Sequence, residues 1–403
     1  MSDVRKSTTC CVVGGGPAGM MLGFLLARAG IEVTVLEKHG DFLRDFRGDT
    51  VHPSTLELMH ELGLLDAFLA RPHDELREIG AEVGDSFIKF ADFTHLPTRC
   101  KFVAFMPQWD FLDFLSGEAK RYPKFRLLMQ TDATGLLRAG ERITGVTANA
   151  PDGPLQIHAD LVVATDGRHS TVREQTKLPL LDRGAPIDVL WLRLPRKDGD
   201  PASVLGRFVA GRVFVTLNRG DYWQCAFVIA KGGIDAVRSA GLDAFRAGIS
   251  RVAPHLRDRV HEIKSWDEVK LLTVTVNRLL KWHLPGLLLI GDAAHAMSPI
   301  GGVGINLAVQ DAVAAANILV PRLRDKSVSE SDLAAVQRRR ELPTKLTQAL
   351  QIAIQNRVLG NVLRMTKTPR PPLPLRLFGR FAYLRRIPAR IIGMGFRPEH
   401  IRC

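Results

Sequence analysis

Residues 12–19 read VVGGGPAG, and this stretch decides the fold. It stands between an apolar run, Thr9–Val13, and a segment with helical periodicity, Ala18–Ala29. Three of its glycines have GxGxxG spacing: Gly14, Gly16 and Gly19. In a strand–turn–helix unit the first glycine permits the tight turn, the second lets the backbone approach a pyrophosphate, and the third lets the helix pack on the sheet. The pattern therefore predicts a dinucleotide site at a helix N-terminus.

The next strand adds a carboxylate to this site. Ile31–Leu36 reads IEVTVL, a β-branched strand, and Glu37 and Lys38 follow it directly. An acidic side chain at this point accepts hydrogen bonds from ribose hydroxyls, which disfavours a ribose with a 2′-phosphate. These first residues alone fit NAD as well as FAD.

A second motif is LVVATDGRHSTVR, Leu161–Arg173. Asp166 and Gly167 end an apolar strand, which suits a loop beside a phosphate or a ribose. Asp-Gly is also a common turn dipeptide, so a plain turn stays open as an alternative.

A third motif is LLLIGDAAHAMSPIGGVGINLAVQDA, Leu287–Ala312. Gly291 and Asp292 end a buried strand, and Asp292 is placed to bond cofactor hydroxyls. A loop containing Pro299, Gly302 and Gly304 leads to a helix that starts near Ile305 and Asn306. A helix N-terminus that faces a flavin ring stabilises negative charge on the reduced ring. His295, alone in a tight loop, fits a structural role better than a catalytic one.

These three motifs, in this order over residues 8–350, resemble the single-component flavin aromatic hydroxylases of the p-hydroxybenzoate hydroxylase type. The resemblance implies non-covalent FAD, with NADH or NADPH bound transiently on the same domain. It implies that a flavin hydroperoxide transfers one oxygen atom from O2 to a small apolar, aromatic or quinone-like substrate. Thr165 departs from this family, which usually has a small residue such as Ala there.

The resemblance also assigns residues. Arg47 matches an arginine that reaches FAD, and Gln108 matches a polar residue that contacts the flavin side chain. The motifs carry the other expected FAD contacts, among them Pro17, Ala18, Pro299, Gly302, Gly304, Ile305 and Asn306. No residue stands out as a catalytic acid, base or nucleophile, and the sequence suggests no metal site.

A second kind of unit interrupts the first. Between Pro186 and Lys231, short strands alternate with turn clusters, which predicts an antiparallel sheet. The expected fold is α/β: a Rossmann-like FAD-binding domain with an inserted, mostly antiparallel substrate domain and a helical C-terminal region. The expected ranges are 1–72, 97–178 and 266–350 for FAD, 73–96 and 179–265 for substrate, and 351–403 for the tail. Substrate candidates on the sheet are Trp191, Phe214, Tyr222, Gln224 and Phe227, although strand aromatics are most often core.

The net charge of +13 is concentrated in the tail. Residues 366–403 contain nine Lys or Arg and one acidic residue, so a global field for nucleic acid is not expected. The tail could be a solvated run, contact anionic lipid, or pack on the protein and form a homodimer contact; packing is favoured.

Five cysteines without a CxxC pair disfavour a zinc or disulfide framework and suit a cytoplasmic location. No apolar run is expected to cross a bilayer.

Three alternatives to a monooxygenase remain at this point. One is an FAD-dependent reductase such as the geranylgeranyl reductases. Another is a flavin halogenase, which the missing WxWxIP motif disfavours. The third is a non-catalytic FAD-binding sensor or scaffold.

Overall fold

The computed structural model describes residues 4–43, 50–200 and 205–403. Its first sheet has the order β19-β20-β11-β1-β2-β8, and the hairpin β9–β10 extends β11. The strands from β20 to β8 run parallel, as the βαβ pattern predicts. Their bounds are β1 Val4–Val13, β2 Val33–Leu36, β8 Phe125–Leu128, β9 Asp132–Ala139, β10 Arg142–Ala150, β11 Gly153–Ala164, β19 His283–Leu284 and β20 Leu287–Leu289.

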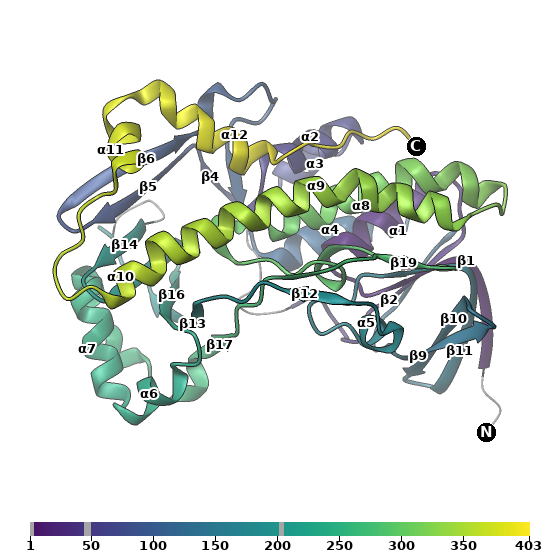
Figure 1. Cartoon of the computed structure of the whole chain (residues 1–403), viewed down its shortest axis with the longest axis horizontal. Coiled ribbons are helices and arrows are strands. Elements are labelled where there is room, and N and C mark those ends of the chain that lie inside the picture. Colours follow the sequence, from purple (N-terminus) through teal and green to yellow (C-terminus); the bar gives the residue numbers. More distant parts are fainter. Residues whose placement is uncertain (1–3, 44–49, 201–204) are drawn as a thin grey trace.

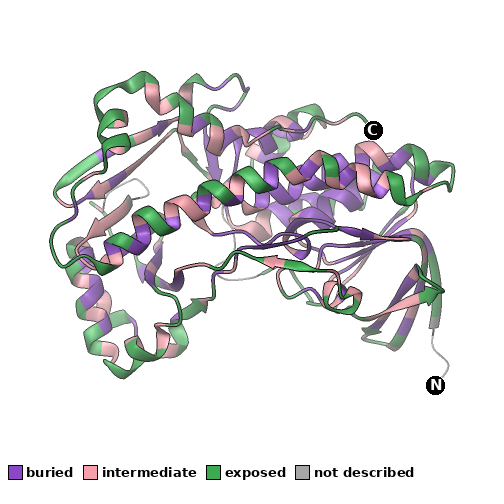
Figure 2. Ribbon diagram, viewed as in Figure 1, coloured by how far each residue is buried: buried purple, intermediate pink, exposed green. Residues whose placement is uncertain are grey.

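Helices cover this sheet and enclose the main core. Helix α1 (Pro17–Arg28) packs against α4 (Gln108–Ala119) and α8 (Gly304–Arg324), and the long α9 (Glu330–Ile354) crosses above α8 (Figure 1). Figure 2 shows α1 and α8 buried on nearly every side, which explains their apolar sequences.

The expectation that no apolar run is long enough to cross a bilayer needs correction. The segment Ile300–Arg324 is long and apolar enough to cross one by length and composition. However, 78% of its most apolar 18-residue stretch is buried inside the protein, as in a core helix.

The second sheet has the order β17-β13-β16-β15-β14-β5-β6 and is antiparallel except where β14 pairs with β5. Its strands come from two distant parts of the chain, residues 78–92 and 187–272. Their bounds are β5 Glu78–Val83, β6 Ser86–Asp92, β13 Ile187–Pro195, β14 Leu205–Val209, β15 Arg212–Asn218, β16 Tyr222–Ala230 and β17 Lys270–Leu272. Helices α6 (Ile234–Ser239) and α7 (Leu242–Val252) lie at the outer end of the molecule (Figure 1).

Smaller elements connect the two sheets. The three-stranded sheet β3-β7-β4 and the two-stranded sheet β12-β18 lie between them in the chain. The bounds are β3 Thr50–Val51, α2 Pro53–Glu61, α3 Leu65–Leu69, β4 Asp74–Leu76, β7 Val103–Phe105, α5 Thr171–Thr176, β12 Leu180–Asp182 and β18 Asn277–Leu279. The exact domain boundaries stay a prediction.

The C-terminal region differs from the expectation. Helix α9 continues through the predicted boundary at residue 351 and is followed by a π-helical turn, Gln355–Leu359, and α10 (Gly360–Arg364). Beyond the prolines there are two helices, α11 (Leu373–Arg380) and α12 (Arg386–Met394). Both pack on β6, and the last residues continue past α2 towards α8 (Figure 1). The tail therefore packs on the protein.

Candidate functional site

The three motifs meet at one edge of the parallel sheet. Val13 of β1 pairs with Ala164 of β11, which pairs with Leu289 of β20. Because these strands are parallel and end in register, the loops that follow them lie side by side at their carboxyl ends. This edge is where open α/β sheets bind their ligands.

The glycine turn is shaped by contact with the second motif. Gly14 has φ of +108°, and a Cβ there would lie 2.6 Å from the carbonyl oxygen of Thr165. A Cβ on Gly19 would overlap the carbonyl oxygen of Gly14. Around Gly16, by contrast, no atom of the described residues lies within 4 Å of a Cβ position. Packing therefore accounts for Gly14 and Gly19, whereas Gly16 leaves room for a ligand.

Thr165 supports this turn. Its hydroxyl lies 2.7 Å from the carbonyl oxygen of Gly14 and 2.9 Å from that of Val13, and it can donate to either. From the sequence alone, Thr165 was only a departure from the resembled family. Its hydroxyl tethers the second motif to the first, a role that the smaller alanine could not fill.

The acidic residue after β2 also contacts the turn. Glu37 accepts hydrogen bonds from the backbone N–H of Gly15 at 3.0 Å and of His39 at 3.1 Å. Its neighbour Lys38 is exposed. Gln108 is the first residue of α4, which packs beside α1. Arg47 lies outside the described residues.

Asp166 holds its own loop together. Its Oδ1 accepts from the Ser170 hydroxyl at 2.5 Å, and its Oδ2 accepts from the Val172 N–H at 3.2 Å. Burial raises the pKa of the Asp166 carboxyl, although these hydrogen bonds act in the opposite direction. The carboxylate therefore anchors the start of α5 beside the glycine turn.

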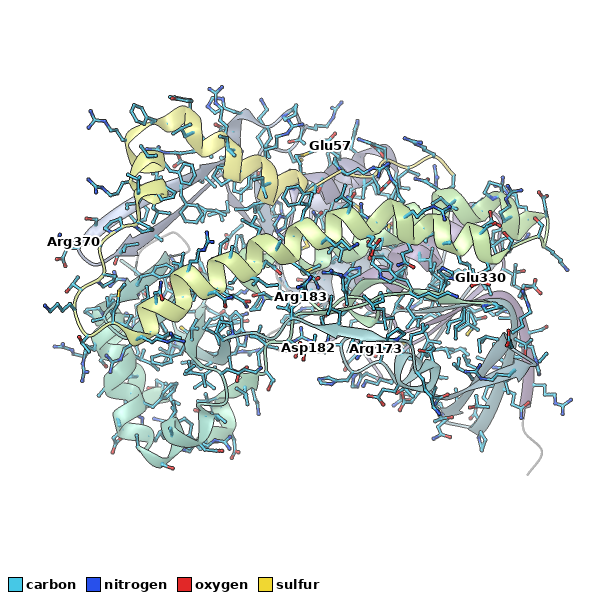
Figure 3. All side chains as sticks on the ribbon, in the orientation of Figure 1. Glu57, Arg173, Asp182, Arg183, Glu330 and Arg370 are labelled. Carbon is cyan, nitrogen blue, oxygen red and sulfur yellow. The ribbon has the colours of Figure 1, made fainter. Side chains whose placement is uncertain are left out.

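The third motif contacts the other two. A Cβ on Gly291, whose φ is +59°, would lie 3.3 Å from the Ala18 side chain. Asp292 lies 3.6 Å from the Arg168 guanidinium, and Arg173 donates to the carbonyl oxygens of Asp292 and Ala293. Arg173 lies at α5, next to the end of the parallel sheet (Figure 3). The sequence predicted the three motifs, and the structure brings them together.

A buried charge network lies behind the third motif. Asp311 of α8 contacts His295 at 2.6 Å and Arg340 of α9 at 3.0 Å, and it accepts from the Gly291 N–H at 3.1 Å. Arg340 continues the network to Glu399 in the tail at 3.3 Å. Burial alone would raise the pKa of Asp311, but His295 and Arg340 hold it below its ordinary value. His295 is fully buried against Asp311, which supports its structural interpretation.

The glycine loop before α8 is held from the opposite side. Thr50 donates to the Gly302 carbonyl at 2.8 Å, and a ring nitrogen of His52 lies 3.1 Å from the same oxygen. Gly302 has φ of +62°, and a Cβ there would overlap the Thr50 hydroxyl. Within the described ranges no atom lies within 4 Å of a Cβ on Gly304, which begins α8. The helix N-terminus is therefore open next to a tightly held loop.

Asn306 and its neighbours differ in their surroundings. The side-chain oxygen Oδ1 of Asn306 accepts from the hydroxyls of Ser54 and Thr55 at 2.8 and 2.6 Å, so it joins α8 to α2. Ile305 is buried in the main core, and Pro299 is half-buried at the start of the loop. Ile305 and Asn306, both predicted to contact FAD, thus also have structural roles at the start of α8.

Two buried glutamines of α9 and one at the start of the π-helical turn after it hold the segment that leads into the glycine loop. Gln348 donates to the carbonyl of Ala296, and Gln351 donates to those of Ser298 and Ile300. Gln355 donates to the Ser298 hydroxyl at 2.7 Å. None of these glutamines was among the predicted site residues. Their spacing of three and four along one helix face is the signal that could have identified them.

The substrate candidates divide between the two faces of the second sheet. Trp191 is opposite Ala226, and its face packs near Ile300 of the glycine loop. Tyr222 and Gln224 alternate in register with Ala226 and share this face.

Phe214 and Phe227 lie on the other face. Their rings are 6.2 Å apart, and Phe227 packs against Phe245 of α7 at 5.3 Å. Packing against α7 therefore favours a core role for these two rings, and their place in the substrate pocket stays a prediction.

The comparisons with known proteins agree with this arrangement. Residues 7–350 match the family described as FAD binding domain. The chain belongs to this FAD-binding family. It is 35% identical over 395 residues to the 6-methylpretetramide 4-monooxygenase of Streptomyces rimosus, covering 94% of this chain and 92% of that protein. It is 29% identical over 314 residues to the rifampicin monooxygenase of Streptomyces venezuelae, covering 75% and 61% of the two chains.

A solved structure supports the fold. The p-nitrophenol 4-monooxygenase PnpA from Pseudomonas putida DLL-E4 superposes with a TM-score of 0.76 at 19% identity, covering 96% of this chain and 97% of that one. The fold predicted from the motifs is confirmed, and the protein is an FAD-dependent monooxygenase. The reductase, halogenase and non-catalytic alternatives are set aside.

Proposed function

We propose that this monooxygenase hydroxylates a polycyclic aromatic substrate of the polyketide type, with NADPH or NADH as electron donor and O2 as oxygen source. The observation that carries this proposal is the similarity to the 6-methylpretetramide 4-monooxygenase, which extends over nearly the whole of both chains. It therefore includes the second sheet, which the substrate would contact. The rifampicin monooxygenase, also named for a large substrate, is a more distant relative.

The residues at the sheet edge fit FAD. Gly16 lies at the start of α1 and leaves space where a pyrophosphate would approach the helix N-terminus. Glu37 would accept from the adenosine ribose, and Asp292 from hydroxyls of the cofactor side chain. Gly304 leaves space at the N-terminus of α8, which would face the flavin ring.

Bound FAD supplies the redox and oxygen chemistry, and the protein supplies position, charge and water exclusion. The open N-terminus of α8 would stabilise negative charge at the ring edge. Trp191, Tyr222 and Gln224 would orient the substrate from the inner face of the second sheet. The glutamines of α9 would keep the glycine loop at a constant distance from that face.

The test is to incubate the FAD-loaded protein with 6-methylpretetramide and, separately, with p-nitrophenol. NADPH and NADH consumption, oxygen uptake and product mass are measured in each case. We expect the polycyclic substrate to stimulate oxygen uptake and to gain one oxygen atom, and the single-ring phenol to do neither. Oxygenation of p-nitrophenol alone would overturn the proposed substrate class. Donor consumption with no oxygen uptake would overturn the proposed reaction.

A further inference from the structure

Helices α11 and α12 and the turn between them carry exposed apolar side chains on the outside of the molecule. Leu373 is 65% exposed and Ile387 is 55% exposed, and Leu377, Phe381 and Tyr383 are exposed as well. These helices lie on the outer side of β6, away from the parallel sheet (Figure 1). In Figure 2 much of the ribbon in this region is coloured as exposed.

Both helices are amphipathic, and each has one side fixed to the protein. In α11, a Cβ on Gly379 would lie 3.3 Å from the side chain of Ile88 in β6, so this side faces inward. In α12, Ala389 is fully buried, and a Cβ on Gly393 would lie 3.2 Å from Pro53. The opposite sides are therefore directed outward, and the positions of the side chains on them follow from helix geometry.

The outward sides repeat one pattern. Positions three, four and seven residues apart share a face of a helix. The outer face of α11 holds Leu373, Arg376, Leu377 and Arg380, and that of α12 with the turn before it holds Tyr383, Arg386, Ile387 and Arg390. Each face alternates apolar side chains with arginines. We name these eight residues the outer stripe.

The charge of this region has one sign. Residues 364–398 contain nine Lys or Arg and no Asp or Glu. In the part of the chain that the structure describes, Arg376, Arg380 and Arg390 have no carboxylate partner. Arg370 lies at the outer edge of the molecule, on the segment that joins α10 to α11 (Figure 3). A binding partner for the outer stripe must therefore supply negative charge to the arginines and also accept the apolar side chains that lie between them.

We propose that the outer stripe docks the enzyme onto a membrane surface that contains anionic lipid. Lipid headgroups pair with the arginines, and Leu373, Leu377, Tyr383 and Ile387 enter the boundary between headgroups and acyl chains. A second copy of this chain is a poorer occupant. A two-fold dimer through this face would bring the same arginines together without compensating carboxylates.

Docking in this way adds to the proposed function without depending on it. Polycyclic apolar substrates partition into membranes, so an enzyme held at the surface would meet them at a higher local concentration. The binding test below uses no substrate and no donor, so its outcome is separate from that of the activity test.

The test is co-sedimentation of the FAD-loaded protein with vesicles of phosphatidylcholine alone or of phosphatidylcholine mixed with phosphatidylglycerol. We expect binding to the mixed vesicles, little binding to the neutral ones, and weakening as salt is raised. Arg376→Gln/Arg380→Gln/Arg390→Gln should weaken binding on the order of a hundredfold, since each basic residue near an anionic surface contributes about 1 kcal/mol. Leu373→Ser/Leu377→Ser should weaken it by about tenfold or more, because less apolar area enters the interface.

A matched control is available on α9. Leu342 and Leu346 are 54% and 40% exposed and have the same spacing as Leu373 and Leu377, but the neighbouring Lys345 is paired with Glu341 at 2.8 Å. Leu342→Ser/Leu346→Ser should bind vesicles like the unchanged protein. FAD content and thermal unfolding are measured for every variant to show that each is folded.

Four results would overturn the proposal. The first is that the unchanged protein stays in the supernatant with the mixed vesicles. The second is that neutral and mixed vesicles bind it equally. The third is that the α9 control loses as much binding as the stripe variants. The fourth is that sedimentation velocity shows a dimer that Leu373→Ser/Leu377→Ser dissociates, which would make a second copy the occupant.

Discussion

Gln351 of α9 hydrogen-bonds both backbone groups of Ser298. Its side-chain N–H donates to the Ser298 carbonyl at 2.9 Å, and its side-chain oxygen accepts from the Ser298 N–H at 3.2 Å. An amide side chain thus serves as the partner that a neighbouring strand would otherwise supply. This contact connects the loop in front of α8 to α9, which is followed along the chain by α10 beside β15 and β16.

Replacing this glutamine should loosen the glycine loop. Gln351→Leu keeps the volume but leaves buried backbone groups of Ser298 and Ile300 without partners, which costs about 1–3 kcal/mol per group. We expect a lower unfolding temperature and a larger share of donor oxidation that yields hydrogen peroxide rather than product. The exposed neighbour serves as control, since Leu350→Gln should change neither quantity. If Gln351→Leu turns the same share of donor oxidation into product as the unchanged protein does, the loop needs no support from α9.

A second prediction concerns Gly16. A side chain at this position would occupy the space left for the cofactor without a clash against the protein, and its φ of −73° suits any residue. Gly16→Val should therefore fold but be purified without FAD, which the ratio of flavin to protein absorbance measures. Gly117→Ala in α4, also an open position, should retain FAD. If Gly16→Val were purified with FAD bound, the pyrophosphate would not lie against Gly16.

The network behind the third motif predicts a pH effect. Because the pKa of Asp311 is lowered in the folded protein, its carboxylate stabilises the fold above the ordinary aspartate pKa of about 3.9. This stabilisation is lost as the pH falls through the lowered value, because the unfolded chain binds its proton first.

Asp311→Asn removes that charge while keeping the shape. It should lower the free energy of unfolding at neutral pH by about 3–5 kcal/mol, because Arg340 stays buried with one partner fewer. The difference from the unchanged protein should shrink as the pH falls below about 4, measured by denaturant unfolding along a pH series. Asp325→Asn, at an exposed position just beyond α8, is the control. A difference that stays constant with pH would mean that Asp311 is not ionised in the native state.

The two faces of the second sheet should respond differently to substitution. Phe214→Ala removes a buried ring beside α7 and should cost about 3–5 kcal/mol of stability, with the substrate KM unchanged in the fraction that folds. Tyr222→Ala on the inner face should instead raise the substrate KM or lower the share of consumed oxygen that ends in product. Its loss of stability should be smaller. Thermal unfolding and steady-state kinetics on one substrate check both. A raised KM in Phe214→Ala with unchanged KM in Tyr222→Ala would reverse our assignment of the faces.

Much of the flavin-binding half could be predicted from the sequence because its signals are local. The spacing of Gly14, Gly16 and Gly19 between a strand and a helix requires only neighbouring residues. The same holds for Gly291 and Asp292 after a buried strand. The substrate side was less predictable, because the alternation in β16 defines two faces but not which one α7 covers. Phe214 and Phe227 could for that reason be named as candidates but not assigned to a face.

The sequence by itself determined the family, the cofactor and the places where the chain turns, because glycine spacing and strand periodicity act over a few residues. Only the tertiary structure decided which distant side chains support the site. The contacts of Thr165 with Gly14, of Asp311 with Arg340 and of Gln351 with Ser298 join segments far apart in the chain. Such contacts exist because buried polar groups must find partners wherever packing places them, and no local pattern specifies that partner. The glycine turn locates the cofactor, and these contacts hold the turn and the glycine loop in position.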